Sequence, residues 1–447
     1  MFIPATSTLP SPHNLSVLPT PLTHSVDTCH DIDNCRTLWQ VIRSCLVTIF
    51  ACTWVSLHLN IPAENERWHR GPLRHLGVML IGIVAPELVV AWAARQWYVS
   101  RELQKRWNDR AAAHGKPWSK THAFFALMGG YVLYSDSHRP EVLDVDYDGD
   151  FRVFFASSDR TASLKAEELA DKGKKDWLAK TFAIIQTVWF VLQCIARAVQ
   201  HITVSELELA TCGFALLNAV TYFLWWNKPQ GVRFPFFVKI QEGPSPREPD
   251  GAPHETTARV EHSLGKKTGP PPETGPRTRW RPKLPSGVLY AFSEMAGNDR
   301  LHSNNEITGT SVPTFYSGDR TPSRDDVAIT LSVEFSIVFG AIHCLAWDFS
   351  FPSYLEAALW RSCALVITCM PAVRLLTYFV QQRTVAGKVL GRLGTGVMWV
   401  MRVVNHSMVV LYVSARFVLL VLVFTLLRSL PESTFQTVSW TSFIPHV

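Results

Sequence analysis

Residues 408–427 read MVVLYVSARFVLLVLVFTLL and contain a single charged residue, Arg416. A bilayer core about 30 Å thick is crossed by roughly 20 apolar residues in an α-helix. This stretch therefore predicts a membrane-spanning helix. A charged side chain at such a depth is costly in lipid and usually faces the bundle interior or a polar cavity, so the stretch also indicates a polar interior.

Six further stretches of similar length extend this prediction to an all-α, polytopic helical membrane bundle with about seven transmembrane helices and two long polar loops. They are residues 38–57, 76–93, 177–196, 209–226, 329–347 and 357–380. The predicted organisation is a tail (1–37), a transmembrane hairpin (38–93), a charged loop (94–176) with a short apolar segment (121–134), a second hairpin (177–226), a Pro-rich and largely disordered loop (227–328), a three-helix transmembrane region (329–427) and a C-terminal tail (428–447).

The composition agrees with a membrane protein that has long polar loops. Of 447 residues, 18% are charged, against about 25% in soluble domains. The net charge of +6 is spread over the loops, which argues against a nucleic-acid partner. No nucleotide-binding, hydrolase or zinc-protease motif is visible, so we expect no cofactor and no metal. The expected partners are membrane lipids and a hydrophobic small molecule, in an endomembrane or the plasma membrane.

Two acidic residues within the apolar stretches are candidate catalytic residues. Glu87 follows Pro86, which can break a helix, and a carboxyl beside such a break suits a proton, a cation or a polar ligand. The structural alternative is a salt bridge from Glu87 to Arg43 or Arg374. Glu334 is the second candidate, but it lies near a span end, and nine helical steps of about 100° place it opposite His343.

Three arginines are candidate ligand-binding residues: Arg43, Arg374 and Arg416. A planar guanidinium group at depth would hold an anionic headgroup or a pyrophosphate. A structural salt bridge is an equally good interpretation of Arg374 and Arg416.

The acidic run DVDYDGD (144–150) resembles the start of a calcium loop. The twelfth position, which needs a bidentate Glu, is Phe155. A turn at Asp148 and Gly149 between two short extended segments is the better prediction.

The sidedness of the chain is predicted in two conflicting ways. Basic residues favour the cytosol for the loops that follow the second, fourth and sixth spans, and with seven spans this places the N-terminal tail in the cytosol and the C-terminal tail across the membrane. Cys29 and Cys35 lie outside the spans and could form a disulfide only in an oxidising compartment. The sequon Asn14-Leu15-Ser16 likewise requires a luminal tail.

Five stretches resemble a family of proteins. They read NCRTLWQVIRSCLVTIFACTWVSLHLNIP, APELVVAWAARQW, WSKTHAFFALMGGYVLY, QTVWFVLQCIARAVQHITVSELELATCGFALLNAVTYFLWWNKP and IHCLAWDFSFPSYLEAALWR, between Asn34 and Arg361. Together they are similar to a largely uncharacterised family of fungal multi-spanning membrane proteins. The resemblance implies the fold and a membrane location, and it transfers no catalytic residue. Residues 141–170 and 241–324 depart from it.

Three hypotheses for function remain open. The first is a polytopic membrane protein of unknown role, which the missing motifs favour as non-enzymatic. The second is an intramembrane enzyme acting on a lipid or isoprenoid, in which Glu87 would protonate an alkene or epoxide. The third is a transporter or seven-span receptor, for which helices broken at Pro86 and Pro371 would provide a midplane site.

Overall fold

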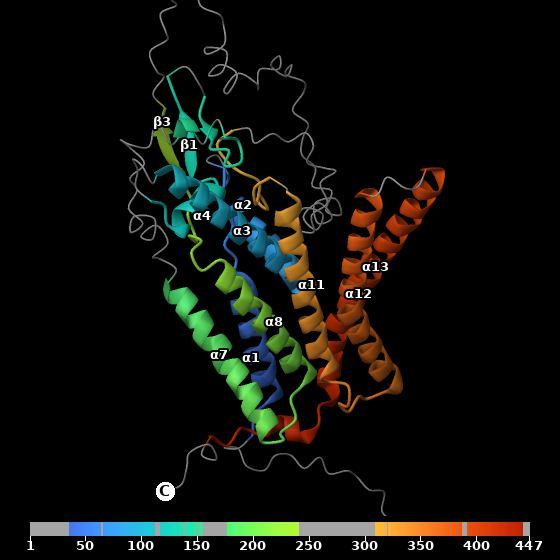
Figure 1. Cartoon of the computed structure of the whole chain (residues 1–447). Coiled ribbons are helices and arrows are strands. Elements are labelled where there is room, and N and C mark those ends of the chain that lie inside the picture. The colour runs from blue at the N-terminus through green and yellow to red at the C-terminus, as the bar shows by residue number, and fades with distance from the viewer. Residues whose placement is uncertain are drawn as a thin grey trace, which may run out of the picture.

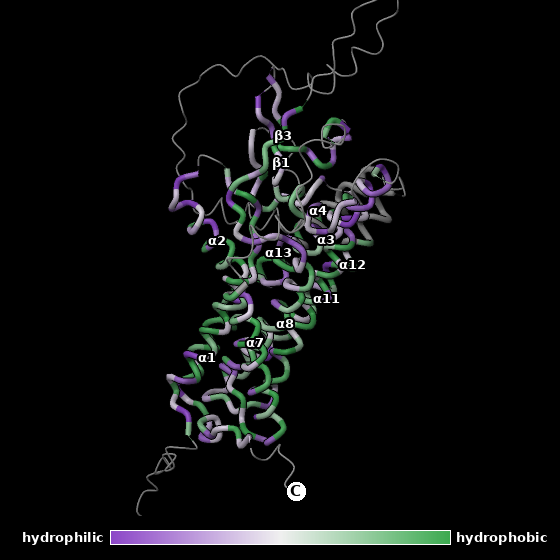
Figure 2. Tube along the Cα trace, turned by 90° about the vertical axis from the view of Figure 1, so that its left-hand side faces the viewer, coloured by the Kyte–Doolittle hydropathy of each residue, from purple (hydrophilic) through white to green (hydrophobic). Residues whose placement is uncertain are grey.

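The computed structural model describes residues 35–63, 66–111, 117–136, 139–148, 150, 152–154, 177–240, 309–319, 321–386 and 391–440. Most of the described chain is helical, and six of its helices are long and apolar enough to cross a membrane. These are α1 (Leu38–Phe50) with its π-helical extension η1 (Ala51–Val55), α7 (Trp177–Val199), α8 (Glu206–Leu224), α11 (Pro322–Cys344), α12 (Tyr354–Ala386) and α13 (Gly391–Thr425). Figure 2 shows these helices as the most hydrophobic part of the molecule, with a more hydrophilic region above them.

The helix starts follow from local capping. Thr37 and Ser205 each form a capping box with the residue three positions later, at the starts of α1 and α8. Thr321 caps α11, whose first residue is Pro322, a favoured residue at that position. These caps explain why α11 begins before the predicted boundary at residue 329.

The predicted span 76–93 is not one continuous helix. It is divided between α2 (Arg70–Val84) and α3 (Pro86–Ala111), whose axes are bent by 113°. Ala85 has φ −144° and ψ 71°, outside the helical region, because the ring of Pro86 disfavours the α conformation in the residue before it. The prediction of about seven helices therefore becomes six, or seven if the bent pair counts as one span.

One end of the bundle, drawn at the bottom of Figure 1, is joined by two arginines. Arg36, before α1, donates to the carboxylate of Glu208 in α8 and to the carbonyl of Thr434 after α13. Arg197, at the end of α7, donates to the carbonyls of Thr434 and Gln436. We call this the lower end, and it joins the start of α1, the end of α7, the start of α8 and the segment after α13.

The opposite, upper end is joined by Lys228 and Asn60. Lys228, just after α8, donates to the carbonyl of His58, which follows α1, and to Gln96 of α3. Asn60 donates to the carbonyl of Pro313, before α11. The chain therefore runs from the lower to the upper end in α1, α8 and α12, and returns in α7, α11 and α13 (Figure 1).

Helices α2 and α3 are both attached to the upper end. The ring of His75 in α2 hydrogen-bonds the carbonyl of Trp54 at the end of η1. The ring of Trp107, near the end of α3, stacks on Trp118 at a centroid distance of 4.1 Å. The break at Ala85 lies between these attachments, so the pair enters the bundle and leaves it at the same end.

A small cap covers the upper end. It contains α4 (Lys120–Leu127) and a three-stranded sheet of order β2–β1–β3, formed by β1 (Tyr131–Tyr134), β2 (Glu141–Val142) and β3 (Phe236–Lys239). β1 pairs antiparallel with β2 and parallel with β3. The short apolar segment 121–134 thus forms α4 and β1, and its Phe125 and Tyr131 lie in the core of the cap with Trp107 and Trp118. Residues 241–308 of the predicted disordered loop lie outside the described residues.

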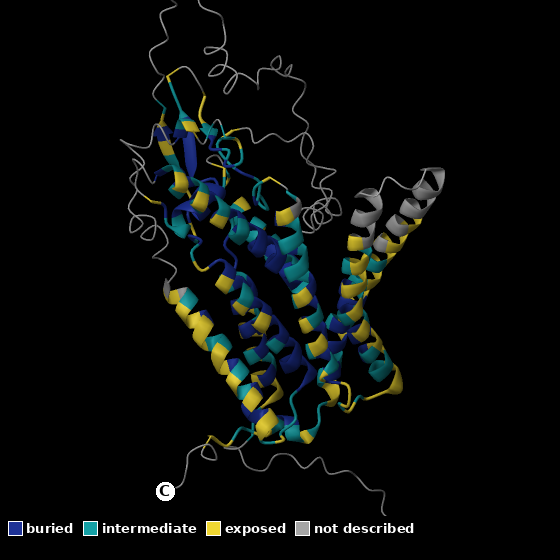
Figure 3. Ribbon diagram, in the orientation of Figure 1, coloured by how far each residue is buried: buried dark blue, intermediate teal, exposed yellow. Residues whose placement is uncertain are grey.

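The outward faces of the long helices are exposed (Figure 3), and many of the exposed residues on them are large and apolar. On α7 the exposed residues recur at helical spacing along its whole length: Leu178, Phe182, Ile185, Val188, Trp189, Leu192, Ile195 and Val199. After α13 the chain forms two short 3₁₀ helices, η4 (Leu426–Ser429) and η5 (Glu432–Phe435). Soluble monomers rarely expose a continuous apolar surface of this extent.

Candidate functional site

A buried ion pair links the start of α3 to the middle of α13. A guanidinium nitrogen of Arg416 contacts one carboxylate oxygen of Glu87, and the hydroxyl of Tyr412 donates to the other at 2.7 Å. Tyr412 and Arg416 are four residues apart and so share one face of α13. Ser332 of α11 donates to the backbone carbonyl of Glu87 at 3.3 Å. The break between α2 and α3 is therefore held by side chains from α11 and α13.

Arg416 is only partly satisfied by these contacts. Its Nε donates to the Tyr412 hydroxyl at 3.2 Å, and one terminal nitrogen, Nη2, donates to both Tyr412 and Glu87. The guanidinium carbon lies 4.0 Å from the centroid of the Phe339 ring, which is a favourable cation–π distance. The second terminal nitrogen, Nη1, makes no hydrogen bond within the described part of the chain. Arg416 thus has donors left for a ligand.

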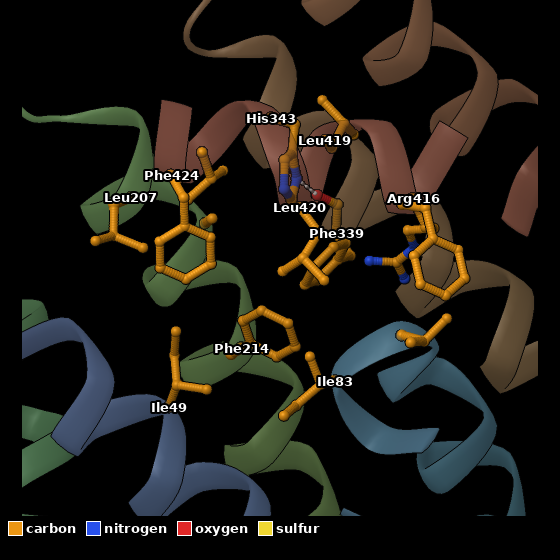
Figure 4. Close-up of a pocket in the computed structure, with 14 residues that line it drawn as sticks. Ile49, Ile83, Leu207, Phe214, Phe339, His343, Arg416, Leu419, Leu420 and Phe424 are labelled. Carbon is orange, nitrogen blue, oxygen red and sulfur yellow. Dashed lines mark hydrogen bonds between the residues drawn. The ribbon is translucent and has the colours of Figure 1, made fainter. Parts of the chain in front are cut away.

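A cavity of about 50 Å³ lies beside this ion pair (Figure 4). Since one water needs roughly 10–15 Å³ by this kind of measure, the cavity has room for a few waters or a short apolar group. Its only charged or titratable lining residues are Arg416 and His343. The others are Ile49 of α1, Ile83 and Val84 of α2, Leu207, Ala210 and Phe214 of α8, Phe339 of α11, and Phe417, Leu419, Leu420, Val423 and Phe424 of α13.

His343 is held in place on the cavity wall. Its Nδ1 hydrogen-bonds the carbonyl of Phe339 at 2.8 Å, and the indole of Trp360 donates to the His343 carbonyl at 3.0 Å. His343 is buried whereas Glu334 is exposed on the same helix, so the two do not share a site. Glu334 therefore has no place in the cavity.

The other predicted binding arginines lie away from the ion pair. Arg43 is exposed on α1 and Arg374 is exposed on α12. The structural alternative for Glu87 was a salt bridge to Arg43 or Arg374, but neither contacts it. Its partner is Arg416. Of the three arginine candidates, only Arg416 lines the cavity.

The structure also reveals a buried lysine, Lys228, that sequence reasoning missed. Besides the His58 carbonyl, its amine donates to the side-chain oxygens of Asn60 at 3.2 Å and Gln96 at 2.7 Å. It also lies 4.8 Å from the ring centroid of Trp225. No carboxylate pairs with it within the described residues, and burial lowers the pKa of Lys228 well below its ordinary value. A lysine just beyond an apolar span usually extends to water, so no sequence pattern indicated this contact.

The carboxylates of the acidic run 144–148 have partners within the protein. Asp144 accepts from the backbone N–H of Asp146, Asp146 pairs with Arg324, and Asp148 pairs with Arg110. Within the described residues no group of three or more His, Cys, Asp or Glu side chains is arranged to hold a metal ion. These carboxylates therefore fasten the cap to α3 and α11.

Cys35 forms a disulfide. Cys29, its expected partner, lies outside the described residues, so that pairing stays a prediction. The seven cysteines within the long helices are free.

No curated protein and no solved structure matches the chain. A family model does match, over two long segments that together include every one of the six apolar helices. That model describes a family of unknown function and assigns no activity to the residues described above. Because it matches residues 17–245 and 320–447, the chain belongs to this family, DUF8562.

Proposed function

We propose that the chain is an integral, multi-pass membrane protein of an endomembrane or the plasma membrane, with six crossings and a re-entrant α2–α3 pair. The observation that carries this proposal is the exposed apolar surface of the six long helices, most extended on α7. In a membrane, lipid would cover this surface. In water, an exposed apolar surface of this extent would promote aggregation. The resemblance to fungal membrane proteins supports the same location.

Extraction from cell membranes tests this proposal. The full chain should stay in the membrane pellet after alkaline carbonate and high salt, and should enter the supernatant only with detergent. Release by carbonate alone would contradict it.

The role that the site supports best is non-enzymatic binding of a membrane lipid or another hydrophobic molecule. Twelve of the fourteen cavity-lining residues are apolar, and Phe417 and Phe424 are also exposed on the outer face of α13, so the cavity adjoins the lipid-facing surface. Arg416 would meet a polar group of the ligand with its unused donors. The cavity is small, so it would take the end of a chain or a small headgroup rather than a whole lipid.

A cavity-filling variant tests this role. Ala210→Phe should occupy the cavity and reduce the lipid that remains bound to the detergent-purified protein, as measured by mass spectrometry. Ala372→Phe, at an exposed position on α12, is the matched control and should retain the lipid. Equal retention in both variants would refute binding in this cavity.

An intramembrane enzyme is less well supported by this geometry. The proposed acid, Glu87, is already engaged by Arg416 and Tyr412, so it is not an unpaired carboxyl available to protonate a substrate. Product analysis in a host supplied with polyprenyl precursors would test the enzyme hypothesis. A new product that disappears with Glu87→Gln, at unchanged protein abundance, would favour it.

A transporter is the second candidate, because broken helices that meet within the membrane often form ion or substrate sites. The break at Ala85, beside the Glu87–Arg416 pair, is the observation that favours it. Proteoliposome uptake assays with candidate anions would test it. No uptake by protein that is folded and correctly inserted would count against it.

A further inference from the structure

The arrangement of the helices assigns each connection to one end of the bundle. Four described segments lie at the lower end: residues 35–37 before α1, the α7–α8 connection (200–205), the α11–α12 connection (345–353) and the segment after α13 (426–440). Arg36 joins the first of these to Glu208 near the start of α8 and to Thr434 in the fourth, and Arg428 joins the fourth to Glu356 at the start of α12. The described helix ends that the other connections join lie at the upper end, including both ends of the α2–α3 pair.

Basic residues are distributed very unequally between the two ends. The connections 200–205 and 345–353 contain no Lys or Arg, residues 426–440 contain only Arg428, and residues 1–37 contain only Arg36. Both of these arginines are engaged with glutamates, Glu208 and Glu356. At the upper end, where α12 ends and α13 begins, residues 381–407 contain Arg383, Lys388, Arg392 and Arg402 and no Asp or Glu. Short basic connections remain in the cytosol, so this asymmetry places the upper end there.

The disulfide of Cys35 provides an independent indication of the same orientation. Cys35 lies at the lower end, where its backbone bridges to Gln436. Disulfides persist in oxidising compartments and are rare in the cytosol. The lower end therefore faces the lumen or the cell exterior.

The two sidedness predictions from the sequence conflicted only because the span 76–93 was counted as a crossing. The described parts of the loops after the second, fourth and sixth predicted spans do lie together, at the upper end. With α2 and α3 entering and leaving at that end, one crossing disappears, and the residues before α1 move to the opposite side. The charge distribution and the cysteines then agree.

We infer that the lower end of the bundle is non-cytosolic and that Asn14, in the sequon Asn14-Leu15-Ser16 outside the described residues, is an N-glycosylation site. The inference rests on the proposed membrane location. Between Asn14 and Cys35 the sequence contains no apolar stretch long enough to cross a membrane, so both residues lie on one side. The sequon Asn-x-Ser is an acceptor for the glycan when it is exposed in the lumen.

The test uses the full chain with an N-terminal epitope in sealed microsomes from a eukaryotic host. The epitope should resist added protease until detergent is present, and endoglycosidase should increase the electrophoretic mobility of the protein. Asn14→Gln should abolish that mobility change. Asn405→Gln is the matched control, because the sequon Asn405-His406-Ser407 lies within α13, and it should leave the mobility change intact.

The possible failures are distinguishable. Digestion of the epitope without detergent would overturn the orientation. A protected epitope with no endoglycosidase effect would overturn the assignment of Asn14. Release of the protein by alkaline carbonate would overturn the proposed membrane location itself.

Discussion

Replacing Arg416 by methionine should destabilise the bundle strongly, because Glu87 would lose its countercharge inside the protein. Removing one partner of a buried ion pair costs about 3–5 kcal/mol. Two unit charges at about 4 Å and an effective dielectric constant of about 20 give a similar value, about 4 kcal/mol. After the substitution, Glu87 would keep only the Tyr412 hydroxyl and the weak contact from Ser332 to its backbone. The expected increase in the unfolded fraction is roughly a thousandfold.

A double variant separates the loss of the pair from general damage. Combining Glu87→Gln with Arg416→Met removes both charges while leaving an oxygen acceptor for Tyr412. Buried ion pairs can often be replaced by neutral groups at little cost, so the double variant should recover most of the lost stability. Arg43→Met, the same substitution at an exposed position on α1, should have little effect.

The assay is thermal unfolding in mild detergent, followed by fluorescence-detected size-exclusion chromatography. Arg416→Met should lower the melting temperature by on the order of 5 °C or more, and the double variant should lie closer to the unsubstituted protein. Equal losses in the single and double variants would show that Glu87 and Arg416 are not coupled. A single variant as stable as the unsubstituted protein would refute the reasoning directly.

Three further predictions concern other parts of the fold. Lys228→Met should lower the free energy of unfolding by about 1–3 kcal/mol in the same assay, because the His58 carbonyl loses its donor. The side-chain oxygen of Asn60 still accepts from Gln96, and that of Gln96 still accepts from Trp225. Unchanged stability would contradict this prediction. The unfolded state keeps a proton on Lys228 up to its ordinary pKa of 10.5, whereas the folded state releases it at lower pH. The free energy of unfolding should therefore rise with pH between the two pKa values. If Lys228→Met does not flatten the melting temperature against pH, this lysine is excluded as the cause. Gly340→Ala should cost about 1–3 kcal/mol, because its Cβ would lie 2.7 Å from the Cα of Thr368 in α12, whereas Gly77→Ala meets nothing within 4 Å and should be neutral or stabilising.

Most of the helical architecture could be predicted from the sequence. The predicted spans 38–57, 177–196, 209–226, 329–347, 357–380 and 408–427 overlap α1, α7, α8, α11, α12 and α13, because membrane-length apolar runs are strong local signals. The second predicted span, 76–93, is instead divided between α2 and α3, whereas Pro86 in the sequence indicates only a kink. A bend of 113° depends on contacts of Glu87 with α11 and α13, which local sequence cannot reveal.

The candidate site could be predicted only in part. Glu87 and Arg416 stood out as single charges in apolar stretches, but the pairing of residues 329 positions apart depends on how the helices pack. Lys228 and Arg197 gave no signal, because most of their acceptors are backbone carbonyls or neutral amides from distant segments. Such acceptors have no residue-type signature in a sequence.

The most direct test of the account compares the sides of the membrane reached by the two ends of the α2–α3 pair. Epitopes would be inserted between Ala63 and Glu66, before α2, and between Ala111 and Pro117, after α3, and each would be probed in selectively permeabilised cells. The account predicts that antibodies reach both epitopes once the plasma membrane alone is opened. Epitopes on opposite sides would make α2–α3 a seventh crossing and contradict the re-entrant arrangement.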